Sequence, residues 1–339
     1  MNRIGKYTVR TDGVFISSAA AVVGKTEHDG PLGEHFDFSF PDDGMGQTSW
    51  EQAESELHRK AVETAVKKSN LTPDKIDIHF GGDLLNQCCA TTFGVKDFNI
   101  PIAGLFGACS TMALAMALSA VFVSSGYADN ALASASSHFC SAEKQFRFPL
   151  EYGGQKPPTA QRTATAAGAG VISNSDNGSN VKVESAIFGR ICDPGITDAN
   201  NMGAAMAPAA ADTIVRFLND TNTVPEDYDM ILTGDLGAIG SELLTDILAE
   251  NYNLDISKVH NDCGLMLFDK EKQDVYSGGS GCGCSASVVC SYIFQKLSSG
   301  EIKKVFFAGT GALMSPTTSQ QSLSIPSIAH GVLLTGKGV

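Results

Sequence analysis

Apolar runs alternate along the chain with polar, periodic segments, and this alternation predicts strands and helices in turn. Residues 13–24 form an apolar run that predicts a buried strand leading into a turn, followed by a polar loop to about Gln47. Residues 50–69 place alanines and a leucine at helical spacing with charges between them, which predicts an amphipathic helix. The glycine- and alanine-rich run 167–172 predicts another buried strand.

Two patterns of the first half recur in the second half in the same order. Residues 71–84 combine a Thr-Pro turn signal, an apolar strand and a Gly-Asp-Leu end, and residues 223–236 repeat the Pro-acid-x-x-Asp start, the strand and that end. A Ser-Ser-Gly helix end followed by an apolar strand occurs at residues 124–135 and again at residues 298–309. Two echoes in one order indicate an internal duplication.

The duplication predicts an α/β protein made of two similar layered halves, each with a largely buried sheet. We place the first half at residues 1–175 and the second at residues 176–339, because the stretch 174–180 is rich in turn-forming residues. At 339 residues the chain is long enough for two such units.

Residues 104–118 run from two glycines through Cys109 into an alanine-rich segment, which predicts a helix that begins at about Cys109. A thiol at a helix N-terminus faces unpaired N–H groups and the positive end of the dipole, which lowers its pKa and suits a nucleophile or an anion site. The alternative is that Cys109 is a small core residue, since free cysteine is commonly buried. Because no charge lies between Asp97 and Asp129, the helix should be buried all round.

Charge and composition exclude several classes of protein. The net charge of −13 argues against non-specific nucleic-acid binding, which needs a positive surface. The nine cysteines lack zinc-ligand spacing, and we interpret them as reduced thiols. Residues 101–126 are uncharged and imitate a membrane span, but their glycines and serines and the lack of basic flanks favour a buried helix. Residues 1–6 lack the apolar core of a signal peptide, so we expect a soluble chain.

A duplicated α/β chain with Gly-x-Cys at the start of a buried helix resembles the thiolase-like superfamily, which includes thiolases and ketoacyl synthases. The resemblance covers nearly the whole chain. It includes the strand 167–172 and the Gly-Thr-Gly at residues 309–311, which is similar to the superfamily's last glycine loop. It implies the duplicated α-β-α-β-α architecture and places Cys109 at the nucleophile's position.

The enzymes of this superfamily also use two polar residues of the second half, a His/Asn pair or a His with a second Cys. At the first of these positions this chain has residues 233–235, Thr-Gly-Asp, and at the second it has the glycine-rich run 277–284. The resemblance therefore implies a degenerate site and a protein that is not an enzyme. The alternative is an active acyl-CoA thiolase or ketoacyl synthase with Cys109 as nucleophile and His138 or His260 as base.

Four longer strings resemble a family of stage V sporulation proteins of spore-forming bacteria; they are residues 107–111, 136–149, 278–284 and 325–330. This resemblance implies binding of dipicolinic acid (pyridine-2,6-dicarboxylic acid), or its calcium chelate, for uptake into the developing spore, with a bearing on germination. Membrane proteins of the same sporulation locus would be partners, and the chain would be cytoplasmic or peripherally associated with the spore inner membrane. A third hypothesis is a structural subunit of a membrane complex with a vestigial pocket.

A flat ring with two carboxylates needs apolar walls, hydrogen-bond donors and a cation. The candidate ligand-binding residues are Cys109, Ser137, His138, Cys140, Lys144, Arg147, Arg162, Gly279, Ser280 and Gly311. For His138 the alternative is a structural histidine, and for the cations it is an ordinary solvated loop. No calcium-loop pattern is present, so calcium should arrive with the ligand, and no cofactor is predicted. The superfamily usually pairs through the edge of the first-half sheet, so a homodimer is expected.

Overall fold

A computed structural model describes residues 2–146 and 156–339. Its main sheet contains two sets of five strands with the same order and the same directions. In each set, two antiparallel pairings are followed by two parallel pairings. The first set is β3 (Phe15–Val23), β9 (Ala166–Ser173), β7 (Asn130–Ser137), β5 (Ile78–Gly82) and β6 (Ile102–Gly104); the second is β10 (Lys182–Ile187), β15 (Ser327–Thr335), β14 (Lys304–Ala312), β11 (Met230–Thr233) and β12 (His260–Asp262).

The sequence echoes occupy equivalent places in the two sets. Strands β5 and β11 are both the fourth strand of their set, and each follows a 3₁₀ turn, at Pro73–Lys75 and at Pro225–Asp227. Strands β7 and β14, which follow the two Ser-Ser-Gly helix ends, are both the third strand. The α/β class with two similar sets of strands, joined in one sheet where β10 pairs with β3, is confirmed, while the division at residue 175 stays a prediction.

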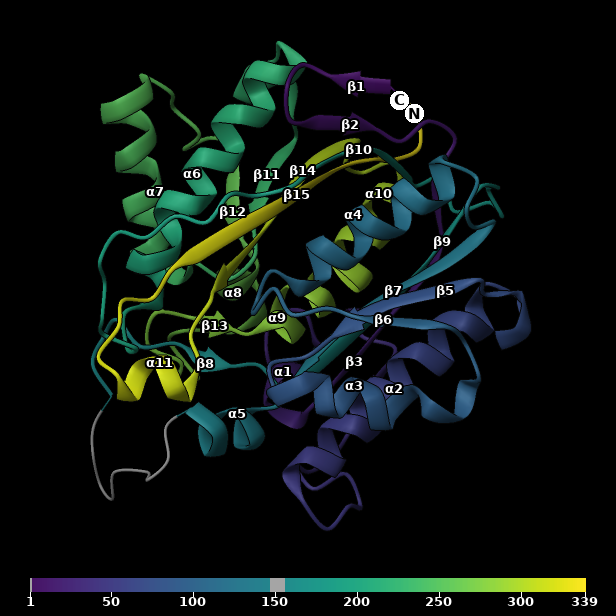
Figure 1. The fold of residues 1–339 in the computed structure, drawn as a ribbon, viewed down its shortest axis with the longest axis horizontal. Coiled ribbons are helices and arrows are strands. Elements are labelled where there is room, and N and C mark those ends of the chain that lie inside the picture. Colours follow the sequence, from purple (N-terminus) through teal and green to yellow (C-terminus); the bar gives the residue numbers. More distant parts are fainter. Residues whose placement is uncertain (1, 147–155) are drawn as a thin grey trace.

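The helices form three layers around these two sheets, which gives the α-β-α-β-α arrangement that Figure 1 shows with α4 and α9 between the outer pairs. Apolar faces on both sides of each sheet require this covering. The outer pairs are α2 (Trp50–Lys68) with α3 (Cys89–Val95) and α6 (Met202–Thr221) with α7 (Gly237–Tyr252), and the central pair is α4 (Thr111–Ser124) with α9 (Cys282–Val288).

Helix α2 has the limits that its periodicity predicts, within one residue. Ser49 caps its start, because the Ser49 hydroxyl accepts a hydrogen bond from the backbone N–H of Gln52. Its alanines and Leu57 are buried against the first-half sheet, and Lys67 and Lys68 occupy the last turn, where cations interact favourably with the dipole. The predicted strand at 13–24 is also confirmed, as β3.

Helix α4 begins two residues later than the sequence predicts. Its first residue is Thr111, and Cys109 lies in the loop before it, directly after Ala108 with φ of 49°. A positive φ is uncommon for a residue with a Cβ atom, so this loop is a constrained connection between β6 and α4. The helix is buried on most sides, as its composition predicts. Among residues 2–146 and 156–339, no helix is long and apolar enough to cross a membrane.

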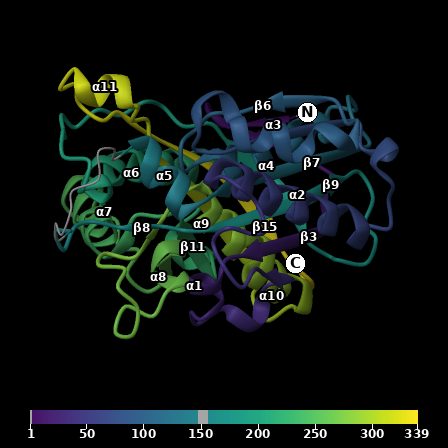
Figure 2. The ribbon, with the colours of Figure 1, turned by 90° about the horizontal axis from the view of Figure 1, so that it is seen from below.

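Shorter elements complete the fold. Two segments that were predicted as loops are regular structure. Residues 309–311 lie inside strand β14, and the run 278–284 forms a short strand and the start of α9. Figures 1 and 2 both place α5 and α11 at the same end of the molecule. The shorter elements are β1 (Asn2–Ile4), β2 (Thr8–Arg10), β4 (Phe38–Ser39), β8 (Arg162–Thr163), β13 (Gly279–Ser280), α1 (Lys25–His28), α5 (Phe139–Phe146), α8 (Cys263–Leu267), α10 (Phe294–Ser299) and α11 (Pro316–Gln320).

Candidate functional site

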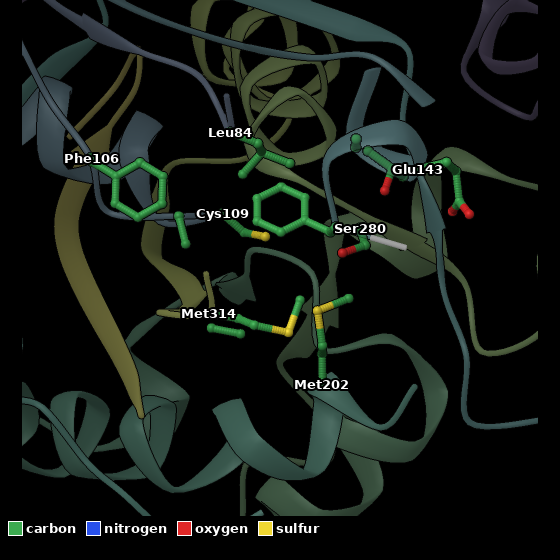
Figure 3. A pocket seen from close by; sticks show the side chains of 12 residues that line it. Leu84, Phe106, Cys109, Glu143, Met202, Ser280 and Met314 are labelled. Atoms are coloured by element: carbon green, nitrogen blue, oxygen red, sulfur yellow. The ribbon is translucent and has the colours of Figure 1, made fainter. Parts of the chain in front are cut away.

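A pocket opens at the end of the molecule where α5 and the segment after β14 meet, with Cys109 in its wall. Figure 3 shows Cys109, Ser280, Met202 and Met314 directed into a common space, with Glu143 on the side opposite Phe106. The centre of a water molecule could move through about 40 Å³ of this space, so as it stands the pocket holds a few waters. The lining residues are Leu84, Phe106, Ala108, Cys109, Ala142, Glu143, Phe146, Thr163, Met202, Ser280, Ala312 and Met314.

Most of the pocket wall is apolar, and two of its residues are methionines. Methionine side chains rotate easily and fill irregular gaps. Met202 begins α6 and Met314 follows β14, so both lie at ends of elements rather than inside the core. Because neither is fully buried, these side chains can move aside and widen the pocket for a small ring.

The thiol of Cys109 lies among polar groups of the second half. The carboxyl group of Asp235, the Ser280 hydroxyl and the Gly281 N–H are its polar neighbours. Burial, followed by the charge of Asp235, raises the pKa of the thiol well above its usual value. The lowered pKa predicted from the helix dipole is therefore wrong, because burial and a neighbouring carboxylate outweigh the dipole.

Asp235 is the functional residue that the sequence analysis missed. It follows β11, at the place where the resemblance leads one to expect a catalytic residue, and it is fully buried. Its carboxylate accepts hydrogen bonds from Thr310 Oγ1 (2.8 Å), the Gly281 N–H (2.9 Å) and Ser280 Oγ (3.2 Å). Burial raises its pKa in spite of these donors. Its position after β11 was the available signal.

Of the three predicted residues in the glycine-rich segments, Ser280 lines the pocket and the two glycines allow close packing. A Cβ atom on Gly311 would lie 2.3 Å from the carbonyl oxygen of Gly107, in the loop that precedes Cys109. One on Gly279 would lie 3.0 Å from the ring of Phe268. Gly311 therefore lets β14 approach the loop that carries the thiol.

Ser137 and His138 lie at the end of β7, and their polar atoms are used inside the protein. The Ser137 hydroxyl donates to the carbonyl of Ala164 and accepts from the Gly283 N–H. The Nδ1 atom of His138 accepts from the Cys140 N–H, so its Nε2–H donates to the carbonyl of Asp43 at 2.8 Å. Both residues are buried and neither lines the pocket, so a direct role for them in ligand binding stays a prediction.

Two of the predicted cationic residues, Lys144 and Arg162, lie around α5, as does Lys156, and all three have partners. Lys144 pairs with Glu51 at 2.5 Å, and Lys156 pairs with the pocket residue Glu143 at 3.1 Å. The guanidinium of Arg162 stacks over the ring of Phe139 with 4.1 Å between Cζ and the ring centroid.

The same segment contains two further predicted residues. The thiol of half-buried Cys140 has its pKa raised by burial to about 11. Arg147 lies outside the described residues, so its predicted contact with a ligand is not placed. Among these cations, Lys156 therefore lies at the pocket rim, because it forms an ion pair with the lining residue Glu143.

Neither histidine considered as a base contacts the thiol. The Nε2 atom of His260 interacts with Thr233 Oγ1 at 3.0 Å, and burial lowers the pKa of His260 to about 4. Burial also lowers the pKa of His138. Within the part of the chain that the structure describes, no cluster of three His, Cys, Asp or Glu side chains could hold a metal ion.

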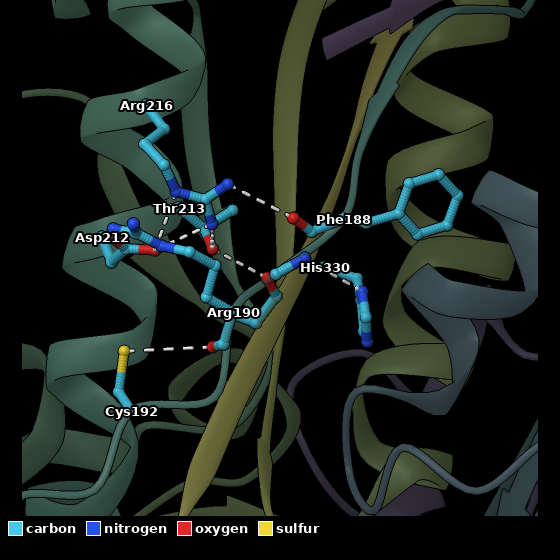
Figure 4. A network of polar contacts seen from close by, with 9 residues as sticks. Phe188, Arg190, Cys192, Asp212, Thr213, Arg216 and His330 are labelled. Atoms are coloured by element: carbon cyan, nitrogen blue, oxygen red, sulfur yellow. Dashed lines mark hydrogen bonds and ion pairs between the residues drawn. The ribbon is translucent and has the colours of Figure 1, made fainter. Parts of the chain in front are cut away.

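Arg190 takes part in a separate polar network on the outer side of the second sheet, shown in Figure 4. Asp212 of α6 pairs with both Arg190 and Arg216, and Arg216 also donates to the carbonyl of Phe188. The backbone N–H of Gly189 donates to Nδ1 of His330 on β15. This network holds the segment after β10 against α6 and β15, away from the pocket.

Comparisons with known proteins agree with this architecture. The family model described as stage V sporulation protein AD (SpoVAD) matches residues 5–335. The stage V sporulation protein AD of Bacillus subtilis (strain 168) is 46% identical over 339 residues, which covers 100% of this chain and 99% of that protein.

Solved structures of ketosynthase-type enzymes share the fold at low sequence identity. One is 3-oxoacyl-[acyl-carrier-protein] synthase III from Aquifex aeolicus VF5, with a TM-score of 0.58 and 14% identity over 95% of this chain and 99% of that chain. Another is AbyA1, a tetronic acid condensing enzyme, with a TM-score of 0.60 and 16% identity over 95% of this chain and 100% of that chain. These similarities show a thiolase-like fold.

Proposed function

Because the chain belongs to the stage V sporulation protein AD family, we propose that it binds dipicolinic acid or its calcium chelate in the pocket beside Cys109, without catalysis, for uptake into the developing spore. The observation that carries the proposal is the combination of an apolar pocket with a protonated, buried thiol. Such a site holds a small molecule by shape and hydrogen bonds and lacks the thiolate that acyl transfer requires.

The pocket suits a flat aromatic ring more than a long acyl chain. Phe106 and Phe146 provide rings against which a pyridine can pack, and the Met202 and Met314 side chains can move to admit it. Thr163 supplies a hydroxyl group for a carboxylate oxygen, and the Ser280 hydroxyl, which donates to Asp235, could turn to the ligand when Asp235 is protonated. At the rim, the ammonium group of Lys156 provides a positive charge beside Glu143.

The charge of this pocket bears on which form of the ligand enters. Glu143 lines the pocket and pairs with Lys156, and the carboxyl group of Asp235 lies behind the wall, where it accepts from the Ser280 hydroxyl. A calcium chelate brings its own cation, which would interact favourably with these carboxylates. The free dianion would instead use Lys156 at the rim. Both forms stay within the proposal.

Binding calorimetry tests the proposal directly. We would titrate dipicolinate, with and without calcium, into the wild-type protein and the Cys109→Ala, Ser280→Ala and Ala142→Leu variants, with benzoate as the control ligand. Cys192→Ala, which removes a half-exposed thiol outside the pocket, is the matched control. We expect saturable binding that the pocket variants weaken and Cys192→Ala preserves. Equal binding by all variants would place the site elsewhere, and no binding would leave a structural subunit with a vestigial pocket.

The alternative of an active thiolase or ketoacyl synthase rests on the fold and on the position of Cys109. Such an enzyme forms an acyl thioester on this cysteine after losing a proton from it. Incubation with acetyl-CoA followed by mass spectrometry of the Cys109 peptide distinguishes the two functions. The binding protein should remain unmodified, and an acetyl adduct on Cys109 that is absent from Cys109→Ala would favour the enzyme.

We further propose that the chain forms a homodimer and associates with membrane proteins of its sporulation locus. Strand β6 ends the main sheet, so one side of its backbone is open to pairing. Ile102 on this strand and Phe106 just after it are 45% and 49% exposed. An open edge next to exposed apolar side chains supports pairing with a second copy.

A further inference from the structure

We propose that Glu54 is a positioning residue of the pocket, whose side chain carries a proton and uses it to hold helix α5 against helix α2. Glu54 is fully buried on α2 and is not among the pocket residues. Helix α5 supplies three of those residues, Ala142, Glu143 and Phe146. The link between the two helices is Ser141 of α5, which contacts Glu54. Glu54 itself would touch no ligand, so this role goes beyond the binding site proposed above.

The Ser141 hydroxyl has two hydrogen-bond partners and a single hydrogen. Its oxygen lies 2.5 Å from Glu54 Oε2 and 3.0 Å from the backbone carbonyl oxygen of His138. A carbonyl oxygen can only accept, so the hydroxyl must donate if this contact is a hydrogen bond. The contact between Ser141 and Glu54 is then a hydrogen bond only when Glu54 carries a proton on Oε2. A protonated Glu54 satisfies both contacts, and an ionised Glu54 satisfies one of them.

From the other oxygen of Glu54, a chain of buried contacts leads to two histidines. Ser136 Oγ lies 3.3 Å from Glu54 Oε1 and 2.9 Å from His58 Nδ1. His58 Nε2 lies 2.8 Å from Ser134 Oγ, which lies 2.6 Å from His79 Nε2. Burial lowers the pKa of both histidines to about 3, so each ring is neutral and carries one N–H.

A proton on Oε2 of Glu54 is consistent with one direction for every bond in this chain. Oε1 is then an acceptor, so Ser136 donates to it and His58 donates to Ser136 through Nδ1–H. His58 Nε2 accepts from the Ser134 hydroxyl, which requires His79 to donate to Ser134 through Nε2–H. Nδ1 of His79 is then a bare acceptor, and within the described part of the chain this buried atom has no hydrogen-bond partner. The opposite direction would leave a buried N–H there without an acceptor, which is rare in folded proteins.

The groups around Glu54 favour its protonated form. Burial raises its pKa well above the usual value, and the negative charges of Asp83 and Glu51 act in the same direction. Asp83 accepts hydrogen bonds from the backbone N–H groups of Leu85 and Thr91, at 2.8 and 2.7 Å, which stabilise its ionised form. Of these two buried acids, Glu54, whose contacts are hydroxyl groups, is therefore the one that takes the proton.

Infrared difference spectroscopy tests the proton on Glu54 without any ligand. A protonated carboxyl group has a C=O stretching band that a carboxylate lacks, and the difference between wild-type protein and Glu54→Gln isolates the band of this residue. At pH 7 we expect a carboxylic-acid band. Glu226→Gln, which changes an exposed glutamate, is the control and should remove carboxylate bands instead. Carboxylate bands for Glu54 at pH 7 would overturn the proposal.

The single tryptophan of the chain, Trp50, reports whether the start of α5 stays in place. Its ring stacks on that of His138, which precedes α5, with 5.9 Å between the ring centroids. Glu54→Gln can still donate to Ser141 and accept from Ser136, so it should keep the wild-type fluorescence of Trp50. Glu54→Leu has neither ability and should change it. Wild-type fluorescence in a folded Glu54→Leu protein would overturn the positioning role.

Dipicolinate titrations of the same variants connect this role to the pocket, and this readout rests on the proposed function. We expect Glu54→Gln to bind like wild-type protein and Glu54→Leu to bind about tenfold more weakly, the effect of losing one buried hydrogen bond. Ser141→Ala, which removes only the hydroxyl, covers the case in which Glu54→Leu fails to fold, and should change both readouts in the same way. If the fluorescence changes as expected and no form binds dipicolinate, the proposed function fails and the role of Glu54 stands. Equal binding by all variants would overturn that role.

Discussion

Burial, followed by the charge of Asp235 in the second half, raises the pKa of the thiol of Cys109, which lies in the first half and lines the pocket. Burial also raises the pKa of Asp235, whose carboxylate accepts a hydrogen bond from the hydroxyl of the pocket residue Ser280. The protonation of Asp235 is therefore coupled to whatever charge enters the pocket.

The first prediction is that an anionic ligand binds more tightly at lower pH. Asp235 is buried behind the pocket residue Ser280, whose hydroxyl donates to it, so protonation of Asp235 removes a negative charge from behind the wall and the protonated protein has the higher affinity for a carboxylate ligand. Because the pKa of Asp235 lies above its usual value, the affinity for free dipicolinate should fall as the pH rises through that raised pKa. Calorimetry between pH 5 and pH 8.5 should show this fall in wild-type protein and a flat profile in Asp235→Asn.

Two controls make that measurement specific. In buffers with different ionisation enthalpies, the wild-type protein should take up protons on binding free dipicolinate, and Asp235→Asn should take up fewer. The calcium chelate, which carries its own cation, should show the weaker pH dependence. An identical pH profile in wild-type protein and Asp235→Asn would assign the effect to another group, with Glu143 at the rim as the next residue to test.

The second prediction concerns Gly311. Gly311→Ala should lower the free energy of unfolding by about 1–3 kcal/mol and weaken ligand binding, since its Cβ atom would lie 2.3 Å from the Gly107 carbonyl oxygen and displace the loop that carries Cys109. Gly170→Ala in β9 is the matched control, because its Cβ atom would meet nothing closer than 3.6 Å. Urea denaturation and calorimetry of both variants provide the test. Equal stability of Gly311→Ala and Gly170→Ala would show that the loop before α4 can shift away from the added Cβ atom at little cost in free energy.

Local patterns in the sequence predict the parts of the fold that local forces determine. The limits of α2 follow from its periodicity and from Ser49 as its cap, and the repeated Pro-turn and strand segments predict the duplication. The meeting of Cys109 with Asp235 depends on the pairing of whole sheets. No local sequence pattern predicts that these two residues lie close together, although the position of Asp235 after β11 was recognised.

The predicted pKa of Cys109 was wrong because the prediction considered the helix dipole, which is a small effect, and left out burial, which is a larger one. A helix dipole contributes about 0.3–1 kcal/mol and acts within the first turn, whereas full burial shifts a pKa by up to about 3–5 units. Helix α4 also begins at Thr111, beyond Cys109. His138 was placed correctly after β7, but its ring bonds to the carbonyl of Asp43 and the N–H of Cys140, which spacing along the chain does not reveal.

The third prediction concerns stability and Glu27, a fully buried carboxyl group whose pKa burial raises to about 7. A raised pKa means that the folded state binds the proton more tightly than the unfolded state, where the value is about 4.5. Glu27 therefore destabilises the protein progressively as the pH rises from about 4.5 through 7. The size of this effect is about 3 kcal/mol.

Urea denaturation between pH 4.5 and pH 8 measures the effect of Glu27. Glu27→Gln should gain stability relative to wild-type protein as the pH rises, because the glutamine cannot ionise and its carbonyl oxygen can still accept from the Thr165 N–H. Glu226→Gln, which changes an exposed glutamate, is the control and should follow the wild-type curve. A constant difference between Glu27→Gln and wild-type protein across this range would mean that Glu27 has the same pKa in the folded and the unfolded protein.

The last prediction tests the proposed dimer at the open edge of β6. A lysine in place of Ile102 would be buried twice, once from each copy, in an interface formed by this strand, and burying an unpaired ammonium group opposes association. Ile102→Lys should therefore be monomeric by size-exclusion chromatography with light scattering, at concentrations where wild-type protein is dimeric. Val224→Lys, at a residue that is 53% exposed and lies before β11, should remain dimeric. A dimer that tolerates Ile102→Lys and dissociates with Val224→Lys would move the interface to the second half of the chain.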